Sequence, residues 1–153
     1  RRHGVELGAY WTPLEAVILD ADYSWSHARF TEYDPAGDYI PGAVETVVSV
    51  GLSVQRDTGW FGGARWRYFG PAPLIEDNSV RSHSTSTVNA QAGYRFSPRL
   101  SVMASVFNLF DADANDISYF YESQLPNESQ PVADIHFHPA EPRTLRVAAT
   151  VRF

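Results

Sequence analysis

Three side chains able to bind a metal ion or a polar ligand occupy alternate positions in the segment ADIHFHPAE: Asp134, His136 and His138. Because successive side chains of an extended chain point to opposite sides, all three would project from one side of a strand. Imidazole and carboxylate groups at this spacing can bind zinc, nickel, copper or iron. Histidines in a long polar segment are more often simply solvated, and no fourth ligand is specified. We therefore favour a role in lining a ligand entrance and predict no metal site.

Two tyrosines, Tyr119 and Tyr121 in the segment YFYES, belong to the same long stretch between two predicted strands. Their rings could stack on an aromatic or sugar-like ligand, or they could pack against neighbouring loops. Binding residues are often found on loops that a rigid scaffold holds. The candidate ligand-contacting set therefore consists of Tyr119, Tyr121, Asp134, His136 and His138.

A second set consists of arginines that fall on the polar side of alternating segments: Arg65, Arg67, Arg95, Arg146 and Arg152. These side chains could attract an anionic solute or contact another domain. The alternative, which we favour, is a wall in contact with water in which arginines pair with carboxylates such as Asp20, Asp22 and Glu6. Packing so many arginines together without water would leave unpaired charges, each costing several kcal/mol.

Composition excludes several classes of function. The chain has 153 residues, no cysteine and a formal net charge of −6, which argues against a nucleic-acid partner and against disulfide or cysteine–zinc scaffolds. It contains no Gly-x-Ser-x-Gly, no phosphate-binding glycine loop and no His-Glu-x-x-His motif. We therefore predict neither an enzyme nor a bound cofactor.

Seven segments alternate apolar and polar residues with the period of a β-strand, and Gly, Pro, Asp, Asn or Ser residues separate them. They cover roughly residues 3–11, 16–30, 45–55, 60–69, 87–96, 100–107 and 143–153. Short connections at 12–15, 56–59 and 97–99 alternate with long ones at 31–44, 70–86 and 108–141. This pattern predicts an all-β, antiparallel up-and-down meander of about seven strands, with all short turns at one rim.

The solvent around this sheet follows from three features. Trp and Tyr residues lie near both ends of the apolar stripes, as they do where hydrocarbon meets lipid headgroups. Several segments have the length that a tilted strand needs to cross a bilayer. The opposite sides are too polar for a protein core. We predict a closed wall with lipid outside and water inside. A soluble β-sandwich, a lipocalin-like binding module and a passive porin-like component are the alternatives.

Several segments resemble one family. The segment VFNLFD, following AGYRFSPRLSV, resembles the next-to-last strand of TonB-dependent outer-membrane receptors, and the terminal VAATVRF resembles the last strand of outer-membrane barrels. The segments IPGAVETVVSVGLSV and GVELGAYWTPLEAVILDADYSW are also similar to the late part of such barrels. The resemblance spans nearly the whole chain.

The resemblance implies that residues 1–153 are the C-terminal section of a 22-stranded transmembrane β-barrel, without its plug domain. It implies a place in the cell outer membrane, with short turns in the periplasm and long loops outside. The implied function is TonB-energised uptake of a scarce ligand of the ferric siderophore, cobalamin or oligosaccharide class. Implied partners are outer-membrane lipid, the plug and remaining strands, the TonB system, and a barrel-insertion machinery that recognises Val151 and Phe153. Plug contact is then the favoured functional use of the arginines.

Overall fold

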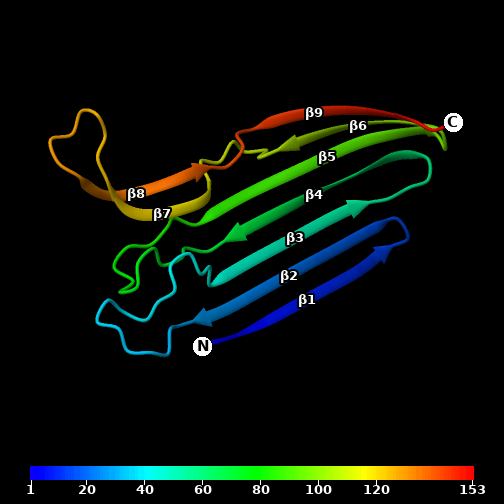
Figure 1. Ribbon diagram of the computed structural model, residues 1–153. Helices are drawn as coiled ribbons and strands as arrows, with labels where there is room; N and C mark the ends of the chain where they lie inside the picture. The colour runs from blue at the N-terminus through cyan, green and yellow to red at the C-terminus, as the bar shows by residue number, and fades with distance from the viewer.

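The computed structural model describes residues 1–153 and consists of β-strands joined by turns and loops (Figure 1). Seven strands form one antiparallel sheet in the order β1-β2-β3-β4-β5-β6-β9, which confirms the predicted meander. Their bounds are β1 (Arg2–Leu14), β2 (Val17–Ala28), β3 (Thr46–Val54), β4 (Gly59–Phe69), β5 (Thr85–Ser97), β6 (Leu100–Phe107) and β9 (Thr144–Val151). The structure contains no helix that could span a membrane.

Two further strands were not predicted. The connection between β6 and β9, expected to be a long loop, contains β7 (Asn115–Ser123) and β8 (Val132–Pro139), which pair with each other as a separate hairpin. This hairpin carries aromatic residues on both sides, among them Phe120 on one and Tyr121 on the other. A simple apolar–polar alternation is therefore absent, and the period of two that predicts the other strands does not predict these.

Short and long connections lie at opposite ends of the sheet. The long connections, the β7–β8 hairpin and the N-terminus lie at one end, here called the loop end, whereas the short turns and the C-terminus lie at the other (Figure 1). Where the turn after β3 leads into β4, Gly59 has φ +82°, a conformation that residues with a Cβ rarely adopt. The tight turns keep the strands that they connect in register over most of their length.

The register gives the sheet one apolar and one polar face. In β9, Leu145, Val147 and Val151 share the apolar face, where partners in β6 include Val106 and Val102. Corresponding positions in the other strands carry Val, Leu, Ala, Trp and Tyr. The opposite face carries Ser, Asn, Gln, Asp and Arg side chains. Each residue's face follows from its parity along the strand, as the sequence predicts.

Nothing packs against the apolar face. Trp11 is 63% exposed, and Leu145 and Val147 are each 66% exposed. A soluble sandwich would bury these side chains against a second sheet at a gain of roughly 1.5–3 kcal/mol each. The sheet has no such partner, whereas a wall in contact with lipid presents this arrangement.

The few buried apolar side chains lie at the loop end. Ala72, Pro73 and Leu74 from the β4–β5 connection are buried, and so is Ala28 at the end of β2. The backbone N–H of Gly42 donates to the Pro73 carbonyl at 2.8 Å, so the β2–β3 and β4–β5 connections pack together. This small core holds the long connections in a defined position beside the polar face.

Candidate functional site

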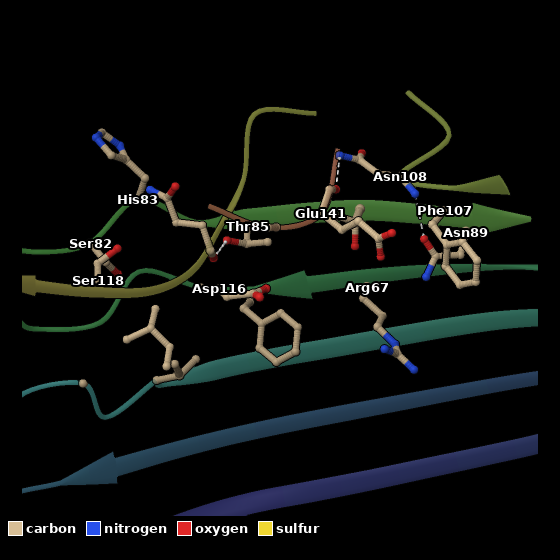
Figure 2. A pocket seen from close by; sticks show the side chains of 18 of the residues that line it. Arg67, Ser82, His83, Thr85, Asn89, Phe107, Asn108, Asp116, Ser118 and Glu141 are labelled. Atoms are coloured by element: carbon tan, nitrogen blue, oxygen red, sulfur yellow. Dashed lines mark hydrogen bonds between the residues drawn. The ribbon is translucent and has the colours of Figure 1, made fainter. Parts of the chain in front are cut away.

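A cavity of about 540 Å³ lies where the polar face meets the loop end (Figure 2). Strands β4 and β5 form its floor, and the end of β6, the start of β7 and the chain before β9 close its sides. Its lining combines one guanidinium, two carboxylates, two phenylalanine rings and uncharged polar groups, among them Arg67, Asp116, Glu141, Phe69, Phe107, Thr87 and Asn89. Of these residues, the sequence analysis singled out only Arg67.

Asn108, the Asn of the VFNLFD segment, builds one side of this cavity. It is 5% exposed and has φ +47°, a conformation that Asn tolerates better than most residues. Its side-chain Nδ2 donates to the carbonyls of Ala112 at 2.9 Å and Glu141 at 3.2 Å, and its Oδ1 accepts the Ala112 N–H at 2.9 Å. Its own backbone N–H donates to Asn89 Oδ1 at 2.9 Å. The corner after β6 is therefore fixed to both the floor of the cavity and the chain entering β9.

Asp111 closes the same corner from the other side. Its Oδ1 accepts the backbone N–H of Arg143 at 3.0 Å, and its Oδ2 lies 3.7 Å from the Arg143 guanidinium. Together with Asn108, it joins the two ends of the excursion that carries β7 and β8. The hydroxyl of Thr85 adds a third tie by donating to the Asn115 carbonyl at 2.8 Å. The hairpin is thus anchored at its base, beside the cavity.

The structure places the five candidate ligand-contacting residues on one side of the β7–β8 hairpin. Tyr119 pairs with His136 and Tyr121 with Asp134, while His138 lies opposite Ile117. The Tyr121 and His136 rings are stacked, with centroids 3.9 Å apart and an interplanar angle of 13°. An open cavity of about 440 Å³ is lined by Tyr119, Tyr121, His136, Phe137 and His138.

This hairpin side offers stacking and hydrogen bonding. The hydroxyl of Ser123 lies 3.3 Å from His136 Nε2. Asp134 instead accepts the backbone N–H of Ile135 at 2.7 Å. No group of three or more His, Asp or Glu side chains is arranged to hold a metal ion, here or elsewhere in the chain.

Four of the five predicted arginines lie on the polar face, as the strand register shows for Arg65, Arg67, Arg95 and Arg146. Arg152 follows the end of β9 and joins Arg95 and Arg99 around a cavity of about 210 Å³ at the short-turn end.

Only Arg65 pairs with a carboxylate. Its Nη2 lies 2.7 Å from Asp20 Oδ2, and its Nη1 donates to Ser49 Oγ at 2.7 Å. The other four have no carboxylate oxygen within 4.0 Å, so neither Asp22 nor Glu6 forms the expected ion pair. Arg95 lies 4.8 Å from the Phe61 ring centroid and donates to the Arg56 carbonyl. Arg146 lies 5.0 Å from the Phe107 ring centroid. The polar face therefore presents several guanidinium groups without a charged partner.

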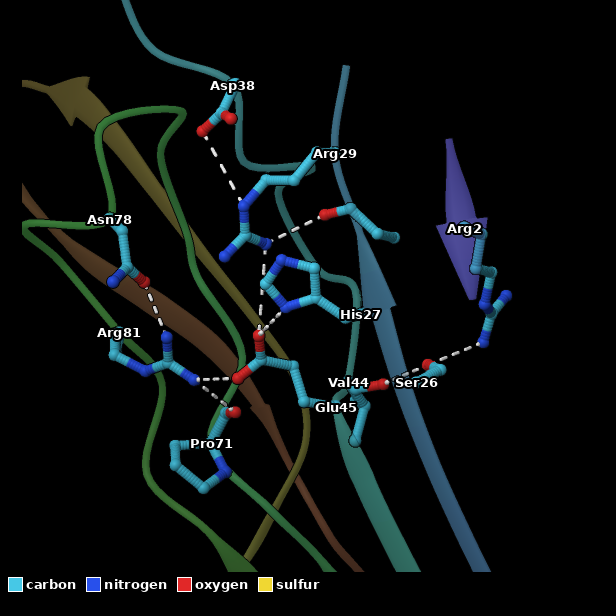
Figure 3. A network of polar contacts seen from close by, with 11 residues as sticks. Arg2, Ser26, His27, Arg29, Asp38, Val44, Glu45, Pro71, Asn78 and Arg81 are labelled. Carbon is cyan, nitrogen blue, oxygen red and sulfur yellow. Dashed lines mark hydrogen bonds and ion pairs between the residues drawn. The ribbon is translucent and has the colours of Figure 1, made fainter. Parts of the chain in front are cut away.

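The long connections are held by a second polar network, around Glu45 (Figure 3). The Arg81 guanidinium donates to Glu45 Oε2 at 2.9 Å, while Arg29 and His27 lie 3.9 and 3.8 Å from Oε1. The Arg29 guanidinium stacks over the Tyr39 ring, 3.2 Å from its centroid. This network could not be predicted from the sequence, since its members come from three separate segments. It ties the β2–β3 and β4–β5 connections to the end of β2.

One exposed turn in the β4–β5 connection carries a perturbed carboxyl group. Hydrogen bonds from the Ser79 backbone N–H, which lies 2.9 Å away, and then from the Ser79 hydroxyl lower the pKa of Asp77 below its ordinary value of 3.8. Asp77 therefore keeps its negative charge at the loop end to a lower pH than an ordinary aspartate does.

The two residues of the predicted assembly signal lie at the short-turn end. Val151 is the last residue of β9 and Phe153 is fully exposed beyond it. Arg152 continues the backbone pairing by donating its N–H to the Arg99 carbonyl at 2.8 Å.

Comparison with known proteins agrees with this geometry. The family model described as "TonB dependent receptor-like, beta-barrel" matches residues 1–109. A search of curated proteins gave no match. Among solved structures, the chain is similar to the ferric yersiniabactin uptake receptor FyuA from Yersinia pestis, with 22% identity and a TM-score of 0.76. The ferric citrate transporter FecA matches with 21% identity and a TM-score of 0.75, and the copper transporter OprC with 19% and 0.63.

These alignments cover 99% of this chain but only 23–24% of each solved chain. The likeness to solved structures, at this level of identity, concerns the fold. The family match extends over most of the sequence. The chain belongs to the TonB-dependent receptor β-barrel family, whose members are transporters of the bacterial outer membrane and not enzymes.

Proposed function

We propose that residues 1–153 form a C-terminal section of an outer-membrane receptor barrel that takes up a scarce ligand with energy from the TonB system. The cavity of about 540 Å³ between the polar wall and the long connections is the observation that carries this proposal. It opens on the face opposite the apolar one, which is where a solute would pass in a lipid-embedded barrel. Its floor is a sheet held by continuous hydrogen bonding, and its sides are anchored by Asn108.

The ligand class that we propose is a metal complex of the ferric siderophore type, in preference to cobalamin or an oligosaccharide. The three relatives named above carry, by their descriptions, ferric yersiniabactin, ferric citrate and copper. Arg67, Thr87 and Asn89 can donate hydrogen bonds to the oxygen atoms of a chelate, while Asp116 and Glu141 can accept them from its hydroxyl or amide groups. Phe69 adds an apolar surface. The hairpin residues Tyr119, Tyr121, Asp134, His136 and His138 would contact the ligand as it enters.

The unpaired arginines of the polar face are a second argument, in favour of a plug domain inside the complete barrel. Arg67, Arg95, Arg146 and Arg152 have no carboxylate within 4.0 Å in this section, and guanidinium groups bind carboxylates and carbonyl oxygens strongly where water is partly excluded. We propose that the plug and the remaining strands supply such oxygen atoms. Val151 and Phe153 would serve the insertion machinery from the short-turn end.

Two bulky substitutions at adjacent positions test the site. Thr87 lines the cavity, whereas Val88 faces the apolar side of the same strand. The full-length receptor would be expressed in a strain lacking it. Uptake of radioiron-labelled catecholate, hydroxamate and carboxylate chelates would then be measured with and without a functional TonB.

Thr87→Trp should reduce uptake at least about tenfold at an unchanged level in the outer membrane, because the indole fills the cavity. Val88→Trp should leave uptake unchanged, since an indole is tolerated in contact with lipid. Normal uptake by Thr87→Trp would refute the site. Uptake that continues without TonB would refute the energised mechanism and favour a passive porin-like component.

A further inference from the structure

Two histidines face each other across β1 and β2 at the loop end. His3 and His27 are directly paired in the strand register, and their ring centroids lie 5.2 Å apart at an interplanar angle of 44°. Both occupy the same side of the sheet as Trp25, whose ring centroid is 6.0 Å from His3 and 6.3 Å from His27. This is the apolar face, so the pair is separate from the cavity on the polar face.

The separation of the rings suits joint binding of one ion. Two imidazoles bound to one ion through nitrogens at about 2.0–2.1 Å have ring centroids roughly 4.5–5.2 Å apart, the larger value applying to tetrahedral geometry. Both backbones are fixed by the strand pairing, so only side-chain rotation is needed to bring one nitrogen of each ring to the ion. A cross-strand pair of this kind is therefore largely preorganised.

Glu45 lies behind one of the two rings, with one oxygen slightly beyond hydrogen-bond distance. Its Oε1 lies 3.8 Å from His27 Nδ1, while its Oε2 accepts a 2.9 Å hydrogen bond from Arg81 (Figure 3). A carboxylate on one nitrogen of a histidine orients the ring and leaves the other nitrogen for a metal. In this arrangement Nε2 of His27 is the free nitrogen. Glu45 would thus act as a positioning residue and not as a ligand.

We propose that His3 and His27 form a two-histidine binding site for a divalent transition-metal ion at the outer rim of the sheet. Since no third His, Asp or Glu completes the group, water molecules fill the remaining positions. Imidazole ligands select Cu²⁺, Ni²⁺ and Zn²⁺ over Mg²⁺ and Ca²⁺, and the order of affinities among divalent ions makes Cu²⁺ the tightest. The inference rests on the strand register and is independent of the ligand that the receptor carries.

The test uses the full-length receptor in detergent, with any affinity tag removed, titrated with Cu²⁺ by calorimetry and studied by electron paramagnetic resonance. The wild-type protein should bind one Cu²⁺ with two equatorial nitrogens. His3→Gln and His27→Gln should each abolish this site, whereas His83→Gln should leave it intact. Glu45→Gln should weaken binding about 10- to 100-fold while keeping two nitrogens, because only the orientation of His27 is lost.

Other results would overturn the proposal. Fewer than two nitrogens on the wild-type copper would do so without any variant, so the outcome does not depend on how the variants fold. Unchanged binding in both His3→Gln and His27→Gln would do the same. Loss of the site on replacing His136 and His138, which lie two positions apart on β8, would assign the copper to the hairpin instead.

Discussion

Ala148 and Ala149 are adjacent in β9 and identical in type, yet they face opposite sides of the sheet. Ala148 pairs with Met103 on the polar face, and Ala149 pairs with Val102 on the apolar face. Both lie within the eight-residue strand that runs from Thr144 to Val151, away from its ends. Replacing each in turn with Arg places the same charge at nearly the same depth on either side of the wall. The difference in cost between the two substitutions therefore shows which side of the sheet contacts lipid and which contacts water.

The expected difference is large. An arginine on the lipid side of a barrel costs about 2–4 kcal/mol near the bilayer midplane and about 0–1 kcal/mol near the interfaces. Ala149 is the sixth of the eight residues of its strand, between the middle and the end, so we expect a cost of about 1–3 kcal/mol, which reduces the folding equilibrium constant roughly 5- to 140-fold. Ala148→Arg adds a cation on the water side, beside Arg146 and in the small cavity that Arg95, Arg99 and Arg152 also line. Repulsion between charges in contact with water costs less than about 1 kcal/mol.

The assay is reversible unfolding of the full-length receptor in lipid vesicles by urea, which gives the free energy of unfolding for each variant. Ala148→Gln and Ala149→Gln serve as neutral controls for side-chain length. A cost for Ala149→Arg that is no larger than that for Ala148→Arg would refute the assignment of the two faces. The same comparison can be repeated with Val147→Arg and Thr150→Arg.

Two further substitutions test the polar face and the corner after β6. Gly51→Ala would place a Cβ 2.5 Å from Arg65 Nη2 and Asp20 Oδ1, so the ion pair must shift; we expect a cost of about 1–2 kcal/mol in the same urea assay. Gly8→Ala, whose Cβ would meet its nearest atom at 3.4 Å, should cost less than about 0.5 kcal/mol, and equal costs would contradict the packing. Asn108→Ala removes three side-chain hydrogen bonds to the backbone and should cost about 2–4 kcal/mol. Asn108→Gly permits the positive φ but not the hydrogen bonds, so a stability equal to wild type would refute their role.

The two faces of the sheet could be predicted because facing is a local property. In a strand, the side of residue i determines the side of residue i+2, so the parity of Leu145, Val147 and Val151 suffices to place them together. The alternation of short and long connections then orders the strands. Neither step requires knowledge of contacts between distant residues, and the meander could therefore be predicted from the sequence.

The cavity and its surroundings depend on contacts that the sequence does not display. Arg67, Asp116 and Glu141 come from different parts of the chain, and they meet only because the hydrogen bonds of Asn108 direct the chain back to β9, which pairs with β6. The VFNLFD segment was recognised by its resemblance to a family, but its physical role is visible only in the hydrogen bonds of that corner. The two strands of the hairpin were not predicted for a different reason: aromatic residues on both sides of the hairpin hide the period of two.

The polar face also shows why a net charge says little about a site. The chain as a whole carries −6, yet Arg67, Arg95, Arg146 and Arg152 on or beside one face lack carboxylate partners. The excess of acidic residues lies largely in the long connections, where Asp77 is one example that is held ionised. A guanidinium on a wall that borders water keeps much of its hydration, so it need not be paired for the sheet to fold. Such unpaired groups are free to bind oxygen atoms from elsewhere in the barrel, whereas the paired Arg65 is already committed to Asp20.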